Sequence, residues 1–474
     1  MSDADTAPKS LYFKEPKIYP KRVWGRYRIL KWVSMVVLLA IYYLAPFLRW
    51  DRGPNMPDQA ILIDMDNRRG YFFFIDIWPQ EVYYLTGLLI LAAVGLFFAT
   101  ALAGRVWCGY ACPQTVWTDL FVWVERIVQG DRNARKKLDE APWGFTKLYK
   151  KAVTHFLWLV IGLFTGGAWV FYFNDAPTLL EHIMHLDVPM GVLGWIIALT
   201  LSTYVMAGFA RQQVCKYMCP YARFQSAMFD RDTLIIDYDA KRGETRGKFK
   251  DRANNPEQGD CVDCSLCVQV CPVGIDIREG LQYECIACGL CIDACNGVMD
   301  KVGLERGLIR YDTTTNQEAR EAGKKEDTAW QHIMRPRTFY YTAIMTIVGG
   351  IMLYSLLNRA PLELHVLHDR NPLYVKLSDG SIRNGYDIRV LNKTHEDHHY
   401  ALSISGLPGA QMDIQGAGQL DPNNLRVFAD SVGHFRVFVK ADAQVETRYP
   451  LNFHVKQISG PANDELESVF VSRK

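Results

Sequence analysis

CVDCSLCVQVCP (residues 261–272) is followed, twelve residues later, by CIACGLCIDAC (residues 285–295). Each stretch has the spacing C-x2-C-x2-C-x3-C, and Pro272 follows the first one. This spacing is typical of bacterial ferredoxins that carry two [4Fe-4S] clusters. The two stretches therefore predict a ferredoxin-like module, and with it the transfer of single electrons.

In such a module, three cysteines of one run and the last cysteine of the other run hold each cluster. One predicted ligand set is Cys261, Cys264, Cys267 and Cys295, and the other is Cys285, Cys288, Cys291 and Cys271. The alternative is a pair of four-cysteine zinc sites, but these usually have a long loop between two C-x2-C pairs. Because each cluster takes one ligand from the other run, we expect the two clusters to lie close together.

Charge is distributed very unevenly along the 474 residues, of which 49% are hydrophobic and 22% charged. The net charge of +2 argues against a nucleic-acid partner. Five stretches carry almost no charge and are long enough, or nearly so, to cross a bilayer. These predicted spans are Trp32–Leu48, Tyr83–Gly104, Ala152–Phe173, Val188–Ala210 and Phe339–Leu357.

Basic residues predict how the spans are oriented. The first 31 residues are polar and basic, so no cleavable signal peptide is expected and the N-terminus should stay in the cytoplasm. Residues 105–151 hold nine Lys or Arg, whereas residues 174–187 hold none. The positive-inside rule then places residues 211–337, with the cysteine runs, in the cytoplasm and everything after Leu357 in the periplasm.

The remaining four cysteines form a repeated C-x-Y-x-C-P motif, with Cys108 and Cys112 in the first copy and Cys215 and Cys219 in the second. Each copy follows an even-numbered span, so the first four spans look like two similar hairpins. The proline after each second cysteine marks a helix boundary there. If the two pairs converge, their thiolates suit Cu(I), zinc or an iron-sulfur centre, and ligand type alone does not choose among them. Alternatively, the cysteines are small residues at tight helix contacts.

After the fifth span, about 110 residues show strand-like alternation in six short segments. They are Tyr374–Leu377, Tyr386–Leu391, Tyr400–Ile404, Leu425–Phe428, Phe435–Val439 and Leu451–Val455. Short strands at this spacing predict an immunoglobulin-like sandwich.

The predicted fold is thus a membrane protein: an α-helical bundle of five transmembrane helices, a cytoplasmic 2[4Fe-4S] ferredoxin-like domain and a C-terminal periplasmic immunoglobulin-like β-sandwich. The predicted segments are a basic N-terminus (1–31), four transmembrane helices in two hairpins (32–210), the second motif with an amphipathic segment (211–230), a linker (231–260), the ferredoxin domain (261–312), a second linker (313–338), the fifth helix (339–357) and the sandwich (358–474).

This combination resembles the FixG/CcoG family, also called RdxA, of accessory proteins of cbb(3)-type cytochrome c oxidase. The resemblance covers nearly the full chain and rests on both C-x-Y-x-C-P motifs, both cysteine runs, Gly274-Ile275-Asp276-Ile277-Arg278 and the C-terminal β domain.

The resemblance implies a multi-pass protein of the bacterial inner membrane that binds two [4Fe-4S] clusters. It also implies a cupric reductase that makes Cu(I) available for the copper centre of the oxidase, with Cys108, Cys112, Cys215 and Cys219 as the catalytic, copper-handling residues. Expected partners are a cytoplasmic electron donor, copper chaperones and oxidase assembly factors, and a homodimer is left open. The donor is not identified by the sequence, because no flavin or nicotinamide motif is visible.

Two other functions stay open. The four spans, paired cysteines and two cluster motifs also resemble NapH-type quinol dehydrogenases, although that family leaves the fifth span and the β domain unexplained. The second alternative is a non-catalytic oxidase assembly factor, in which the clusters only stabilise the fold.

Overall fold

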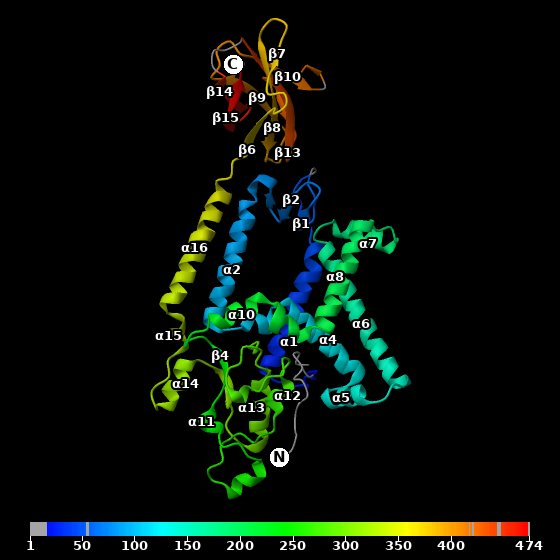
Figure 1. Cartoon of the computed structure of the whole chain (residues 1–474), viewed down its shortest axis with the longest axis vertical. Helices are drawn as coiled ribbons and strands as arrows, with labels where there is room; N and C mark the ends of the chain where they lie inside the picture. Colours follow the sequence, from blue (N-terminus) through cyan, green and yellow to red (C-terminus); the bar gives the residue numbers. More distant parts are fainter. Residues whose placement is uncertain (1–16, 54–55, 417, 420, 443–446, 473–474) are drawn as a thin grey trace, which may run out of the picture. The chain divides into compact units, whose positions relative to one another are not determined.

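The computed structural model describes residues 17–53, 56–416, 418–419, 421–442 and 447–472 (Figure 1). The chain divides into two compact units: Met1–Leu48 with Gln59–Ile351, and Arg49–Asp58 with Met352–Lys474. The first unit holds both cysteine runs and both C-x-Y-x-C-P motifs, and the second holds the β domain. Residues 1–16 of the predicted basic N-terminus lie outside the described residues.

Five helices in the described residues are long and apolar enough to cross a membrane. They are α1 (Arg26–Leu44), α2 (Tyr83–Ala103), α6 (Phe145–Val170), α8 (Met190–Gly208) and α16 (Pro336–Leu357). Each overlaps one predicted span. Little of their surface is covered by the rest of the protein, as expected for helices that are surrounded by lipid.

Helix α1 begins at Arg26, two turns before the predicted span. These turns contain Arg28 and Lys31, which are both buried although they are charged. The Arg28 guanidinium lies 2.9 Å from the carboxylate of Asp119, and the Lys31 ammonium lies 4.0 Å from it. Asp119, which is far along the chain, thus compensates two buried cations in the first turns of α1. No local sequence pattern predicts this long-range pairing.

Short elements connect the spans. They are the 3₁₀ turns Ala45–Phe47 and Pro79–Glu81, the strands β1 (Ile61–Asp64), β2 (Arg69–Phe72) and β3 (Ile75–Ile77), the helices α3 (Val106–Tyr110), α4 (Pro113–Gln129), α5 (Arg132–Glu140), α7 (Ala176–Met184), α9 (Arg211–Gln213) and α10 (Pro220–Ala227), and the π-helical turn Val214–Met218. Helices α6 and α8 lie side by side in Figure 1. A Cβ on Gly166 of α6 would lie 2.9 Å from the carbonyl oxygen of Ile196, so this close approach requires glycine.

The two predicted linkers are not simple connectors. The first contains β4 (Ile235–Tyr238) and α11 (Ala240–Gly243), and the second contains α14 (Thr314–Glu321) and α15 (Ala329–Ile333). Strand β4 pairs antiparallel with β5 (Ile309–Asp312), at the end of the predicted ferredoxin domain. A four-residue strand whose partner is about seventy residues away leaves no local periodicity to detect. The cysteine runs themselves carry α12 (Leu266–Val270) and α13 (Leu290–Val302), with 3₁₀ turns at Phe249–Asn254 and Ile277–Glu279.

The C-terminal unit is a sandwich of two antiparallel sheets. Its strands are β6 (Leu362–His368), β7 (Val375–Lys376), β8 (Ile382–Asn392), β9 (His398–Ser405), β10 (Gln411–Gly416), β11 (Gly418–Gln419), β12 (Leu425–Val427), β13 (Ser431–Ala441), β14 (Arg448–Gln457) and β15 (Asn463–Val471). One sheet has the order β11-β10-β13-β8-β6, with β7 paired to β8, and the other has the order β12-β9-β14-β15.

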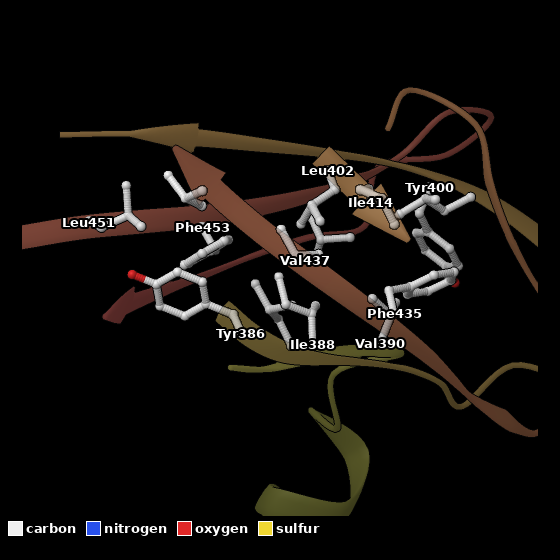
Figure 2. Packing of buried hydrophobic residues seen from close by; sticks show 14 of the residues in the cluster. Tyr386, Ile388, Val390, Tyr400, Leu402, Ile414, Phe435, Val437, Leu451 and Phe453 are labelled. Atoms are coloured by element: carbon white, nitrogen blue, oxygen red, sulfur yellow. The ribbon is translucent and has the colours of Figure 1, made fainter. Parts of the chain in front are cut away.

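Alternating side chains from both sheets fill the core of this unit. Figure 2 shows Tyr386 and Ile388 of β8 and Val437 of β13 packed with Leu402 and Phe453 of the other sheet. All five are almost completely buried. The six predicted strands are present. Strands β6, β10, β11 and β15 were not predicted. The sequence of β15 (NDELESVFV) shows no clear apolar alternation because the polar residues Asp464 and Ser468 stand at its less exposed positions.

Candidate functional site

The two cysteine runs fold into loops with the same backbone conformation. In the first run Asp263 and Ser265 flank Cys264 with φ values of 50° and 53°, and in the second Ala287 and Gly289 flank Cys288 with φ values of 51° and 72°. Left-handed residues are unfavourable unless they are glycine, and such strain persists where the surroundings enforce it. A short helix, α12 or α13, then starts at the equivalent position of each run. The repeated spacing therefore corresponds to a repeated backbone geometry around the second cysteine of each run.

Each predicted ligand set lines its own cavity. Cys261, Cys264, Cys267 and Cys295 line one cavity, together with apolar side chains such as Val298 and Leu308. Cys271, Cys285, Cys288 and Cys291 line the second, with Cys267 at its edge. The structure thus brings together the same two sets of four that the spacing predicts, including the exchanged fourth cysteine. Because Cys267 lines both cavities, the two sites are neighbours.

The surroundings of these thiols fit an iron-sulfur cluster. Burial raises the pKa of Cys267 and Cys285 to about 11 and that of Cys271 and Cys295 to about 12. Backbone N–H groups oppose this rise, two at Cys271 and one at Cys285. Buried thiols with such donors stay protonated until a metal displaces the proton, after which the N–H groups stabilise the thiolate charge. Cluster binding and folding of the module should therefore be coupled.

The C-x-Y-x-C-P motifs have similar local structures. Cys108 lies in α3 and Cys112 caps the start of α4, while Cys215 lies in the π-helical turn and Cys219 caps the start of α10. Each following helix begins at the proline, as the sequence predicts.

The two motifs converge in space. Cys219 is close enough to Cys108 to raise the pKa of its thiol, and both cysteines of the first motif raise the pKa of Cys215 in the same way. Cys108 is buried and the other three are partly exposed. Within the residues that the structure describes, no group of three or more His, Cys, Asp or Glu side chains is placed to hold a metal ion, and this is true of this quartet of thiols and of both cysteine runs.

The first motif packs directly on one of the cysteine loops. A Cβ on Gly109 would lie 2.7 Å from the carbonyl oxygen of Ile286 and 3.1 Å from the Cα of Cys288. The Tyr110 hydroxyl donates a hydrogen bond of 3.0 Å to the carbonyl oxygen of Cys288. Cys108 belongs to one apolar cluster with Cys271, Cys285 and Cys288. The quartet thus borders the cavity of the second ligand set rather than that of the first.

Two polar residues that sequence reasoning missed surround Cys108. Its thiol donates a hydrogen bond of 3.0 Å to Oε1 of Gln225. The same oxygen accepts a hydrogen bond of 3.2 Å from Nε of Arg105. Burial raises the pKa of Cys108 to about 11, and the positive charge of Arg105 opposes that shift. Arg105 stands three residues before Cys108 and could have been suspected, but Gln225 lies in the other half of the repeat and has no local signature.

Cys215 provides access to this site. It lines an open pocket of about 450 Å³ together with Lys216, Tyr217, Arg223 and Tyr283. It also lines a second pocket, on the side of α4, with Asp119 and Arg211. A small solute can therefore approach the quartet from the Cys215 side while Cys108 faces the cysteine loop.

Comparison with known proteins gives three matching family models. A 4Fe-4S dicluster domain matches residues 210–314, a 4Fe-4S binding domain matches residues 85–130, and an IG-like fold at the C-terminus of FixG, a putative oxidoreductase, matches residues 352–473. Protein RdxB of Cereibacter sphaeroides is 52% identical over 88% of this chain and 87% of its own length. Protein RdxA of the same organism is 47% identical over 97% of each chain, and the nitrogen fixation protein FixG of Rhizobium meliloti is 48% identical over 90% of this chain and 87% of its own.

The chain belongs to the FixG/RdxA family. Membership confirms the predicted resemblance and the immunoglobulin-like C-terminal domain. The two iron-sulfur matches and the five apolar helices make this FixG/RdxA protein a transmembrane iron-sulfur redox protein. The match over residues 85–130 contains Cys108 and Cys112, so it relates the first motif to iron-sulfur proteins.

Proposed function

We propose that this protein is a membrane cupric reductase that supplies Cu(I) for the copper centre of a cbb(3)-type cytochrome c oxidase. The observation that carries the proposal is the packing of Gly109 and Tyr110 on the Cys285–Cys288 loop, because it joins the thiol quartet to a cluster site. Bound clusters would supply single electrons, and the reduction Cu(II) + e⁻ → Cu(I) needs one. Thiolates then stabilise the Cu(I) product.

The residues have distinct roles in this proposal. Cys261, Cys264, Cys267 and Cys295 hold the cluster far from the quartet, and Cys271, Cys285, Cys288 and Cys291 hold the near one. Cys215 receives Cu(II) from the open pocket, and Cys108 releases its proton to bind the ion. The Arg105 guanidinium, 3.9 Å from the Cys108 sulfur, stabilises the resulting thiolate. A quartet that an open pocket reaches suits a substrate, since Cu(I) must leave for the next carrier.

The proposal includes the orientation that the charge distribution predicts. The N-terminus, the clusters and the quartet face the cytoplasm of a bacterial inner membrane, and the β domain faces the periplasm. A cytoplasmic donor reduces the clusters, and copper chaperones and oxidase assembly factors receive the product.

The test is anaerobic Cu(II) reduction by dithionite-prereduced, desalted protein, with Cu(I) trapped by a colorimetric chelator. Wild type is compared with a variant in which Cys108, Cys112, Cys215 and Cys219 are all serine. The proposal predicts loss of Cu(I) production while iron and sulfide content stay at two clusters per chain. Unchanged production by the variant would place copper reduction elsewhere, and oxidation of a quinol by wild type would favour a quinol dehydrogenase.

A second candidate is favoured by the 4Fe-4S binding domain match over residues 85–130. In it the quartet holds a third iron-sulfur centre, so electrons continue to another protein and not to copper. Iron analysis of wild type separates the two, because this candidate predicts more than eight irons per chain and a lower value in the quartet variant.

A further inference from the structure

A cavity of about 350 Å³ lies where α1 enters its predicted membrane span. It is lined by none of the cysteines, although Val23 in its wall also packs against the apolar cluster that contains Cys108 and Cys288. Three arginines line it: Arg22 just before α1, Arg28 in its first turn and Arg126 near the end of α4. The cavity is also lined by three tryptophans, Trp24, Trp32 and Trp123. Among the residues that the structure describes, no carboxylate lines the cavity.

The positive charge at this cavity is only partly neutralised by its surroundings. Asp119 pairs with Arg28 but also faces Lys31, so one carboxylate serves two cations. Arg126 is near Asp119 and Asp131 but forms no ion pair with either within the described residues. In the described part of the chain, Arg126 donates only to the carbonyl oxygens of Pro20 and Lys21, at 3.3 and 3.5 Å, and its buried Nε has no acceptor. Burial, with the nearby Arg28, lowers the pKa of Arg126 to about 10 although Asp119 and Asp131 oppose the shift, and the group stays charged at neutral pH. An anion would relieve this repulsion.

The aromatic groups match a membrane interface. Trp24 and Trp123 are 69% and 40% exposed, and Ile127 beside them is 61% exposed. Trp32 packs edge-on against Trp123 at 6.0 Å and beneath the Arg28 guanidinium at 4.9 Å. Tryptophan is enriched at the headgroup level of bilayers, where one part of the ring is wet and the other is in lipid.

We propose that this cavity binds the phosphate group of an anionic membrane phospholipid. The three guanidiniums supply the planar donors that phosphate oxygens prefer, and the exposed tryptophans cover the glycerol and the first acyl carbons. The location at the start of a membrane-spanning helix selects a lipid over a soluble phosphate.

The site has a structural consequence for the cluster module. The start of α1 is held by Asp293 of α13, which accepts hydrogen bonds of 3.2 and 2.7 Å from the backbone N–H groups of Tyr27 and Arg28. Helix α13 carries Cys291 and Cys295. A phospholipid at the neighbouring cavity therefore fixes the module against the membrane surface.

The test is native mass spectrometry of the full-length, delipidated protein in detergent, titrated with phosphatidylglycerol, phosphatidylethanolamine or inorganic phosphate. Arg22→Gln changes an exposed side chain, so it should fold, and Arg126→Gln removes the unpaired cation. Lys150→Gln, at the start of α6 and outside the cavity, is the charge-matched control.

The expected result is preferential retention of phosphatidylglycerol by wild type and by the control, and about fivefold weaker retention for each arginine variant, the effect of one cation near an anionic headgroup. Equal retention of phosphatidylethanolamine would overturn the proposal. So would equal losses in Lys150→Gln and Arg22→Gln, or displacement of the lipid by millimolar phosphate, which would indicate a site for a soluble anion.

Discussion

Gly109→Ala tests the contact between the quartet and the cluster loop with the smallest possible change. The new Cβ would lie 2.7, 3.0 and 3.1 Å from Ile286 O, Ala287 O and Cys288 Cα, all of them backbone atoms that cannot rotate away. Ordinary contact begins near 3.4 Å, so α3 and the loop must separate by about 0.7 Å. Overpacking of this kind costs about 1–3 kcal/mol, which is a factor of roughly 5–150 in the population of the docked arrangement.

The assay for Gly109→Ala combines thermal unfolding with the rate at which prereduced clusters are reoxidised by Cu(II). We expect a lower Tm and slower reoxidation, with iron content unchanged because no ligand is altered. Gly297→Ala in α13 is the matched control, since no atom lies within 4 Å of the added methyl group. If the two alanine variants have the same Tm and the same reoxidation rate, the packing of α3 on the loop is not what links the two sites.

Three further predictions concern stability. Burial, with the nearby Asp312 and Asp239, raises the pKa of Asp237 to about 6, so the protonated form is favoured in the folded state and that stabilisation is lost as pH rises through 6. Asp237→Asn should therefore raise the free energy of unfolding at pH 7.5 by up to about 3 kcal/mol, with a higher Tm, and should have no such effect at pH 4. An effect that is the same at both pH values would contradict this prediction. The buried carboxylate of Glu125 lies 2.8 Å from Arg135 and 3.0 Å from Arg211. Glu125→Gln leaves both cations without this anion and should lower the free energy of unfolding, measured with a denaturant, by about 3–5 kcal/mol. Glu140 forms an exposed ion pair of 3.9 Å with Lys136, so Glu140→Gln should lower the free energy of unfolding by less than about 1 kcal/mol. Similar losses in the Glu125 and Glu140 variants would refute the difference between buried and exposed ion pairs. Tyr110→Phe removes the hydrogen bond to Cys288 O and should cost about 0.5–1.5 kcal/mol by unfolding, with an unchanged Tm as the contrary result.

Much of the fold was predictable because its determinants are local. A membrane span needs only a run of apolar residues, and five such runs correspond to the five long helices. The cysteine spacing predicts the two sets of four because the loop geometry repeats with the sequence. The prolines after Cys112 and Cys219 mark helix starts through their own backbone restriction.

What could not be predicted depends on partners far along the chain. The helical start of α1 depends on Asp119, and β4 depends on β5. Gln225 lies beside Cys108 because the two halves of the repeat approach each other. The symmetry of the sequence suggests this approach but does not predict which residues meet. Strands of the sandwich with polar residues on the less exposed face, such as β15, can be recognised only together with the strands beside them.

The most direct measurement for the central claim is a single turnover without a chelator. Protein with both clusters reduced is mixed anaerobically with one equivalent of Cu(II), and cluster reoxidation is followed by visible absorbance. We predict rapid reoxidation in wild type with one Cu(I) formed per electron lost, and clusters that stay reduced in the variant with serine at positions 108, 112, 215 and 219. Equal reoxidation rates in the two proteins would contradict electron transfer through the thiol quartet.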